Sequence, residues 1–393
     1  MKRYILTITI ALCAICVKAL TVDDIINNIK SNNIILKAIE ESKNRAINNI
    51  KSTNNLSNPE VGFEYHKGSN ISGNKYGFSV TQKIEWPGIY ISRTKVNQSR
   101  IAVENAKQIN EYLNILLDAK QLCIQLVNLN RKINIQQEVV TNISQLYTVY
   151  DKGFKHGEIS IVDINKLKIE MLNVQRAFDE LKAQRVAIKE QIIQLNGDIE
   201  IDQLTTLMDY PTQSLETLEC YLSEVVKFDP TYIEQMADVE AMKKNLSVSK
   251  MGWLPDFSLS YMYTNELGTK FNGFAVGASV PIFANRNKVG ASKSELIAKE
   301  LSQKDILIKL ESTIKAEYSH VVIAKSQMYS YSNILESGNN EKILMKALEG
   351  GQMSLLDYLL ELRYFLEARP TLLDLELEYN SLLTSLNKYQ LLN

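Results

Sequence analysis

The feature that most constrains this chain is a stretch of roughly 64 residues, 89–152, that contains neither proline nor glycine. As one continuous helix it would extend about 95 Å. Globular cores do not use helices of this length, so we predict coiled-coil packing. Apolar positions such as Ile109, Leu116 and Ile124 spread wider than a strict coiled-coil seam. Such a broad stripe is typical of a helix that touches two neighbours and leaves its remaining face in water.

The sequence also repeats itself. "GEISIVDINKLKIE" begins at Gly157 and "GQMSLLDYLLELRY" begins at Gly351, and both read as glycine, two residues, serine, two aliphatics, aspartate and a helical run. In the same order, "NPEVGFEY" from Asn58 resembles "LPDFSLSY" from Leu254. Because self-similarity at one offset indicates a structural repeat, we predict one architecture copied once.

Each half contains an extended region, at about 59–86 and about 255–283, in which apolar and polar residues alternate. This alternation predicts strands with two unlike faces, and the Gly/Asn/Ser-rich connections predict hairpins. Each half thus supplies two strands. Four strands cannot close a barrel, so several chains must pool their strands if these strands face lipid. Two surface hairpins on a soluble protein would show the same pattern.

Long helices are predicted at about 89–152 and 160–197 in the first half, and at about 288–350 and 354–388 in the second. Short loops join antiparallel neighbours, so each half forms a long helical hairpin. Pro370 lies inside the last of these helices and is expected to kink it.

The repeated phrase has a physical cause, since it reverses a very long helix sharply. Glycine supplies torsional freedom at the turn, serine is a favoured N-cap, and a carboxylate in the first turn suits the helix dipole. The candidate site residues of the two turns are Gly157, Ser160, Asp163, Gly351, Ser354 and Asp357.

The N-terminus predicts a secretory signal peptide over residues 1–19, because Lys2 and Arg3 precede an apolar run that ends in Val-Lys-Ala. Acylation of Cys16 is not expected, since bulky Ile15 precedes it. We further expect a first repeat at 20–197 that opens with an N-terminal helix. A linker of short helices at 198–250 and a second repeat at 251–393 follow.

Composition argues against several classes of function. The chain has 44 Lys+Arg and 45 Asp+Glu residues, so no basic surplus indicates nucleic acid. The histidines His66, His156 and His320 stand apart, without a metal, phosphate-loop or nucleophile motif. We therefore expect no catalysis, no cofactor and no bound metal. Cys123 and Cys220 are expected to be unpaired thiols, although export would permit a disulfide.

Together, the signal peptide, the opening "LTVDDIINNIKSNN", the duplicated halves and the paired turns resemble the TolC family of outer-membrane efflux proteins. The "QKIEWPG" stretch from Gln82 is most similar to the branch that partners resistance-nodulation-division pumps. The resemblance implies a mainly helical fold with a membrane β-barrel. In a homotrimer, each chain would give four strands to a twelve-stranded barrel and four long helices to a periplasmic tunnel.

The resemblance also implies a location and partners. The channel would lie in the outer membrane of a Gram-negative bacterium, with its helical turns contacting a periplasmic adaptor and, through it, an inner-membrane pump. Asp163 and Asp357 would then narrow the aperture. The alternative role for both aspartates is local capping of their helices. The family often has an arginine in the second turn, where this chain has Gln352 and Met353. The resemblance therefore predicts no salt-bridge latch here.

The implied function is a passive conduit that exports small molecules or metal ions. A type I protein-secretion channel, a secreted coiled-coil structural or adhesion protein and a periplasmic adaptor remain alternatives. Several aromatic residues in and beside the strands belong either to interfacial belts at the lipid boundary or to ordinary strand packing. They are Tyr65, Phe78, Trp86, Tyr261, Tyr263 and Phe271.

Overall fold

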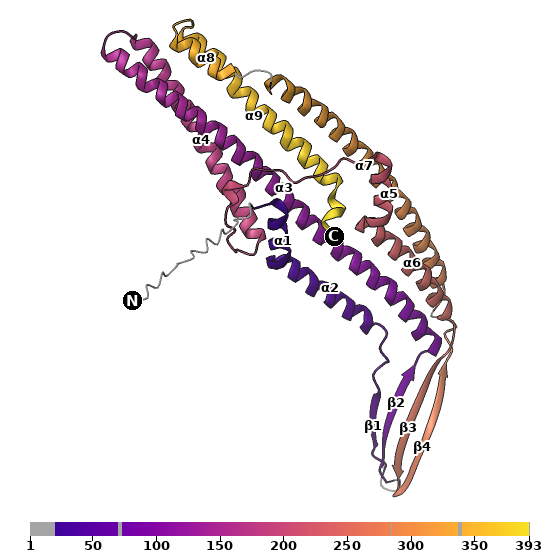
Figure 1. The fold of residues 1–393 in the computed structure, drawn as a ribbon. Coiled ribbons are helices and arrows are strands. Elements are labelled where there is room, and N and C mark those ends of the chain that lie inside the picture. The colour runs from indigo at the N-terminus through magenta and orange to yellow at the C-terminus, as the bar shows by residue number, and fades with distance from the viewer. Residues whose placement is uncertain (1–19, 70–72, 284, 337–339, 393) are drawn as a thin grey trace, which may run out of the picture. The chain divides into compact units, whose positions relative to one another are not determined.

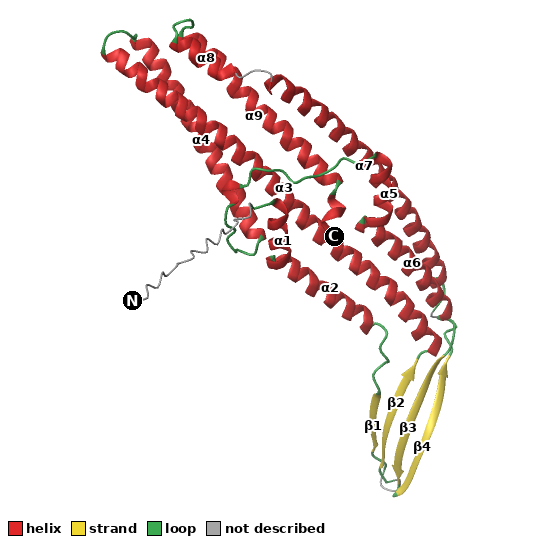
Figure 2. Cartoon of the chain, viewed as in Figure 1, coloured by secondary structure: helices red, strands yellow, loops and turns green. Residues whose placement is uncertain are grey.

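The computed structural model describes residues 20–69, 73–283, 285–336 and 340–392. The predicted signal peptide, residues 1–19 with Cys16, lies outside these. The described residues form mostly helices and one four-stranded sheet (Figure 2). The helices are α1 (Val22–Asn32), α2 (Ile34–Ser52), α3 (Pro87–Lys155), α4 (Ile161–Leu195), α5 (Leu218–Phe228), α6 (Pro230–Met251), α7 (Lys288–Glu336), α8 (Asn340–Glu349) and α9 (Leu355–Leu386). The strands are β1 (Glu60–His66), β2 (Lys75–Ile84), β3 (Asp256–Glu266) and β4 (Thr269–Ser279), and two 3-10 helices are η1 (Leu204–Thr206) and η2 (Lys388–Leu392).

The long glycine- and proline-free stretch is a single helix, α3, of 69 residues. Within the helix predicted at 288–350, the described residues form α7 and α8, and residues 337–339 between them are not described. α9 runs from Leu355 to Leu386 through Pro370 without interruption, since a proline removes only one backbone N–H from the helix. The linker holds more than short helices, because α6 has 22 residues. Among the helices of the described residues, none combines the length and apolarity needed to cross a membrane.

The chain divides into two compact units. Unit 1 comprises Met1–Asn32, Ala119–Gln213 and Ser326–Ser381. Unit 2 comprises Asn33–Asp118, Ser214–Lys325 and Leu382–Asn393. Each unit therefore combines segments from both halves of the duplicated sequence.

Unit 1 is organised around a core shared by α3, α4, α8 and α9. Its buried members are Val139, Ile143, Leu146, Leu167, Val174, Leu355, Tyr358 and Leu362. Because these residues come from both helical hairpins, the α3–α4 turn and the α8–α9 turn lie at the same end of unit 1 (Figure 1). Cys123 in this unit is free and buried, and burial raises the pKa of its thiol to about 12.

Unit 2 contains the sheet, with strand order β1-β2-β3-β4 and antiparallel pairing throughout. The β2–β3 pair joins the hairpins of the two sequence halves. Since neighbouring strands alternate in direction, all four connections to helices leave from one end of the sheet, and both hairpin loops lie at the other (Figure 1). We call these the helix end and the loop end.

The C-terminal segment of unit 2 is fixed by buried hydrogen bonds. Asp229 accepts the backbone N–H of Tyr232 at the start of α6 and the hydroxyl of Tyr389 at 2.7 Å. The Tyr221 hydroxyl donates to the Asn387 side chain at 2.9 Å. Cys220, the other cysteine of the described residues, is also free.

Candidate functional site

The first reversing turn follows α3. Gly157 has a φ of +78°, in the left-handed region where a side chain would be strained. Ser160 is the N-cap of α4, and its Oγ accepts the Asp163 backbone N–H at 3.1 Å and donates to Asp163 Oδ2 at 2.7 Å. Lys166 Nζ lies 3.8 Å from Asp163 Oδ1. Asp163 thus takes part in the N-cap of α4 and also carries a negative charge.

The second turn repeats this geometry. Gly351 has a φ of +67°. Ser354 Oγ accepts the Asp357 backbone N–H at 3.2 Å and donates to Asp357 Oδ2 at 2.6 Å. Within the described part of the chain, no cation forms an ion pair with Asp357. The six candidate turn residues therefore lie at one end of unit 1, in two equivalent caps.

Two adjoining grooves of about 570 and 580 Å³ lie beside these turns, both within unit 1. Gln145 of α3 and Met345 and Glu349 of α8 line both grooves. The first extends to Arg369, whose guanidinium lies 4.0 Å from the Glu138 carboxylate. The second extends to the first reversing turn and is lined there by His156, Gly153 and Glu158. Charged side chains therefore border a partly apolar groove at the turn end.

Further from the turns, charged side chains join α3 to α9. Arg131 forms an ion pair with Glu376, and Lys132 Nζ lies 2.6 Å from Asp374 Oδ1. The Arg131 guanidinium also lies 5.6 Å from the centre of the Tyr210 ring. We name these two ion pairs the α3–α9 clamp. No local signal in the sequence marks this clamp, because its partners are 242 to 245 residues apart and belong to common residue types.

The register of the sheet separates its residues into two unlike faces, since directly paired residues of antiparallel strands point to the same side. On one face, Phe63 pairs with Phe78, Phe78 with Tyr263, and Tyr261 with Phe274. We call this the apolar face. The opposite, polar face is made mainly of glycine, serine, threonine and alanine, with charged residues near its ends.

Four predicted aromatics share the apolar face, namely Tyr65, Phe78, Tyr261 and Tyr263. Phe271 does not, because it pairs with Thr264 and so lies on the polar face. Trp86 lies outside the strands, in the connection from β2 to α3.

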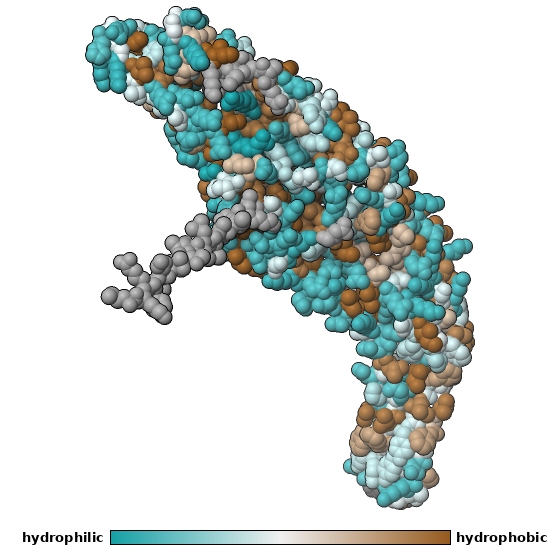
Figure 3. Space-filling model, in the orientation of Figure 1, coloured by the Kyte–Doolittle hydropathy of each residue, from teal (hydrophilic) through white to brown (hydrophobic). Residues whose placement is uncertain are grey.

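The apolar face is exposed to a degree that is unusual for a folded chain. Phe63 is 71%, Phe274 79% and Val276 78% exposed. Figure 3 shows hydrophobic side chains gathered over the strand region, between hydrophilic surfaces. Strands β1 and β4 are the two edges of the sheet, and neither pairs with a further strand of the described chain. Exposed apolar area of this extent marks an interaction surface.

Comparison with known proteins identifies the fold. No protein-family model and no curated protein matches the sequence. Among solved structures, the outer-membrane channel OprN is similar with a TM-score of 0.76 and 13% identity, over 94% of this chain and 89% of that one. The Campylobacter jejuni channel CmeC has a TM-score of 0.71 and 16% identity, over 94% and 85%. The open Neisseria gonorrhoeae channel MtrE has a TM-score of 0.69 and 13% identity, over 94% and 88%.

The chain has the fold of the TolC-type outer-membrane channels. Because the identities are this low, the likeness concerns the arrangement of the backbone and not individual side chains. The described residues contain no group of three or more His, Cys, Asp or Glu side chains placed to hold a metal ion.

Two aromatic residues at the helix end of the sheet in this TolC-type fold were missed by the sequence analysis. Trp253 lies in the connection from α6 to β3 and is 48% exposed, and Phe283 follows β4 and is 87% exposed. The signal that would have found them is their place in the repeat, because each flanks a strand at the same end as Trp86. The Trp86 ring lies 5.9 Å from that of Phe257 in β3.

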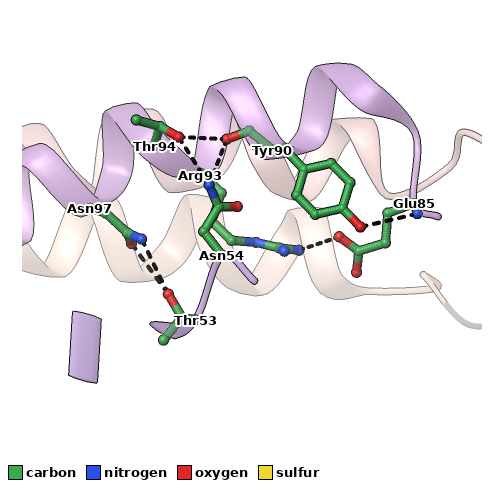
Figure 4. A network of polar contacts seen from close by, with 7 residues as sticks. All are labelled: Thr53, Asn54, Glu85, Tyr90, Arg93, Thr94 and Asn97. Atoms are coloured by element: carbon green, nitrogen blue, oxygen red, sulfur yellow. Dashed lines mark hydrogen bonds and ion pairs between the residues drawn. The ribbon is translucent and has the colours of Figure 1, made fainter. Parts of the chain in front are cut away.

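A polar network fixes this same end of the TolC-type sheet to the first turns of α3 (Figure 4). Arg93 Nη2 lies 2.8 Å from Glu85 Oε2, just after β2. Asn54, beyond the end of α2, donates to the Thr94 hydroxyl at 2.9 Å, and Asn97 donates to the carbonyl oxygen of Ile50 at 2.9 Å. Strand and helix are thereby held together by side chains as well as by the short connection.

Proposed function

We propose that three copies of this chain form a channel through the outer membrane of a Gram-negative bacterium. The observation that carries the proposal is a four-stranded sheet with one exposed apolar face and two unpaired edges. In a membrane, unpaired edges and single sheets are not tolerated, since every backbone group needs a partner. Three sheets joined β4 to β1 would give twelve strands and remove every edge.

The faces of the sheet support one orientation in such a barrel. The apolar face would contact lipid, and the polar face would line the lumen. Small residues crowd the polar face, since a Cβ on Gly62 would lie 2.8 Å from Ser79 Oγ and one on Gly277 2.6 Å from Ser258 Oγ. Small side chains on one face and bulky ones on the other favour curvature toward the small side, which is the direction that barrel closure requires.

In this proposal the long helices of three chains form a periplasmic tunnel, and the two reversing turns form its tip. Three copies each of Asp163 and Asp357 would surround the threefold axis and attract cations, as rings of carboxylates do in channels. The charged, partly apolar grooves beside the turns would receive a periplasmic adaptor, which links the channel to an inner-membrane pump. The channel itself would be a passive conduit for small molecules or metal ions.

The proposal is tested on the mature chain purified in detergent. We expect a trimer by light scattering with detergent correction, and discrete conductance steps after addition to a planar bilayer. A detergent-free, monodisperse single chain that produces no conductance would overturn the proposal. It would favour a secreted or adaptor protein instead.

A further inference from the structure

Three bulky aromatic side chains lie in the connections at the helix end of the sheet, all within unit 2. Ile84 near the end of β2 pairs with Phe257 near the start of β3, and the first residue of β3 pairs with Ser279, the last of β4. Trp86, Trp253 and Phe283 follow or precede these strand ends and therefore leave from the same end. All three are exposed. Exposed aromatic side chains at the end of a membrane sheet are typical of the lipid–water interface.

The connections that carry these residues pack against one another. Asn285 is 7% exposed and lies so close to Gly252 that a Cβ there would come within 3.0 Å of Asn285 Oδ1. The hydroxyls of Ser249 in α6 and Ser292 in α7 lie 2.7 Å apart. The end of α6 and the start of α7 therefore form one surface.

Three cations on this surface have no partner of opposite charge. Lys250 lies in the last turn of α6, and Arg286 and Lys288 lie at the start of α7; all three are exposed, and none forms an ion pair within the described residues. Two other cations at the same end are neutralised, since Lys83 lies 2.6 Å from Glu60 and Arg93 is paired with Glu85. Asp256, the first residue of β3, is also exposed and has no ion pair within the described residues, so three cations stand against one carboxylate on the α6–α7 side.

The start of α7 adds to this positive potential, whereas α6 ends on this surface and Lys250 lies near the negative end of its dipole. α3 and α7 both begin at the helix end of the sheet, and neither has an acidic residue in its first turn. Asp and Glu usually occupy that turn, because they compensate the positive end of the helix dipole. At the start of α7, the helix dipole and the cations Arg286 and Lys288 therefore favour the same ligand, an anion.

We propose that this surface binds the headgroups of anionic phospholipids. Lys250, Arg286 and Lys288 contact the lipid phosphates, while Trp253 and Phe283 lie at the level where headgroups meet acyl chains. The inference rests on the outer-membrane placement proposed above and adds a lipid preference to it. Free phosphate is not the ligand, because only a bilayer satisfies the exposed apolar side chains next to the cations.

The chain carries its own probes for a test, since its only two tryptophans, Trp86 and Trp253, both lie at the helix end. Protein carrying Trp86→Phe, with Trp253 as the sole reporter, is reconstituted into vesicles of phosphatidylcholine and phosphatidylglycerol. In parallel samples, either one lipid or the other carries brominated acyl chains, which quench tryptophan at close range. The ratio of quenching gives the relative affinity of the two lipids for this surface.

We expect phosphatidylglycerol to be preferred several-fold, and a triple variant Lys250→Gln, Arg286→Gln, Lys288→Gln to reduce the preference to about one. Each cation near a membrane surface contributes about fivefold at most. The matched control removes three exposed cations of unit 2 elsewhere, by Lys37→Gln, Lys227→Gln and Lys304→Gln, and should keep the preference. Raising the salt concentration should weaken the preference without any substitution.

The outcomes separate the two proposals. Equal quenching by both lipids in a trimer that conducts, or a preference that survives the triple variant, overturns the headgroup surface and leaves the channel standing. Absence of quenching by either lipid, together with absence of conductance, overturns the channel and this inference with it.

Discussion

Ser354 and Asp357 are joined by reciprocal hydrogen bonds, because the serine hydroxyl donates to the aspartate carboxylate and accepts the aspartate N–H. Ser160 and Asp163 repeat the arrangement in the other turn. Each carboxylate therefore takes part in capping its helix, in addition to any role in cation selection. An asparagine would keep an acceptor oxygen for the serine hydroxyl and remove only the charge.

The double variant Asp163→Asn, Asp357→Asn should accordingly keep both caps while lowering cation preference. We expect the reversal potential in a planar bilayer under a potassium chloride gradient to move toward zero, with a thermal unfolding midpoint close to that of the parent chain. The converse variant, Ser160→Ala with Ser354→Ala, removes a cap worth about 1 kcal/mol at each turn and keeps both charges. It should alter hydrogen exchange at the helix starts and leave selectivity intact. An unchanged reversal potential in the asparagine variant would show that the aspartates cap their helices and do not select cations.

Local patterns explain why the turns and the strands were predictable. Gly157, Ser160 and Asp163 follow one another at intervals of three residues, and strand alternation is read directly from the sequence. The face of Phe271 was also available from the sequence, since Phe271 and Phe274 are an odd number of residues apart on one strand and must point to opposite sides. Grouping aromatics by type alone concealed this.

Other features depend on distant partners and had no local signal. The α3–α9 clamp joins Arg131 to Glu376, and nothing near either residue marks it as an ion pair. The lipid-headgroup surface arises because two connections far apart in sequence pack through Gly252 and Asn285. Such sites need the packing of the whole unit.

Breaking the α3–α9 clamp should loosen α9. The variant Asp374→Asn, Glu376→Gln leaves Lys132 and Arg131 without their partners, and we expect unit 1 to lose roughly 1–3 kcal/mol, mostly from the less exposed Arg131–Glu376 pair. If movement of α9 opens the tip, single-channel recordings should show longer open times.

The control lies on the same helix. Arg363 and Glu367 form an ion pair one turn apart, with side chains 72% and 71% exposed, and such a pair contributes little. Arg363→Gln with Glu367→Gln should therefore leave gating unchanged. Equal open times in the two double variants would show that the α3–α9 clamp does not control channel opening.

A charge placed on the apolar face of β4 should impair membrane insertion, whereas a charge on its polar face should not. Val276 is on the apolar face, and its neighbour Ala275 pairs with Ser260 on the polar face. A lysine facing lipid costs about 2–4 kcal/mol near the bilayer midplane, whereas the lumen tolerates it. We expect Val276→Lys to lower the folded fraction in urea-dependent insertion into vesicles, and Ala275→Lys to insert like the parent chain. Comparable losses from both substitutions would contradict the assignment of the faces.

The buried pair of Tyr389 and Asp229 should make unit 2 sensitive to alkaline pH. Burial, followed by the negative charge of Asp229 and the hydrogen bond to it, raises the pKa of Tyr389 above its ordinary value of 10.0. The folded chain then holds the phenolic proton more tightly than the unfolded chain does. This contribution to stability is fully present below about pH 10 and is lost as the pH rises through the folded-state pKa.

Between pH 9 and 11, the urea midpoint of the parent chain, followed by circular dichroism in detergent, should fall above about pH 10, by up to about 1.4 kcal/mol per pH unit. Tyr389→Phe should remove that component. At neutral pH the same substitution should cost about 1–3 kcal/mol, because Asp229 is 3% exposed and loses its hydroxyl donor, with Lys388 Nζ remaining 3.9 Å away. Tyr364→Phe, at a position 71% exposed, is the matched control and should resemble the parent chain. An alkaline slope that persists in Tyr389→Phe would show that another group titrates, and that the Tyr389–Asp229 hydrogen bond does not govern the stability of unit 2 at high pH.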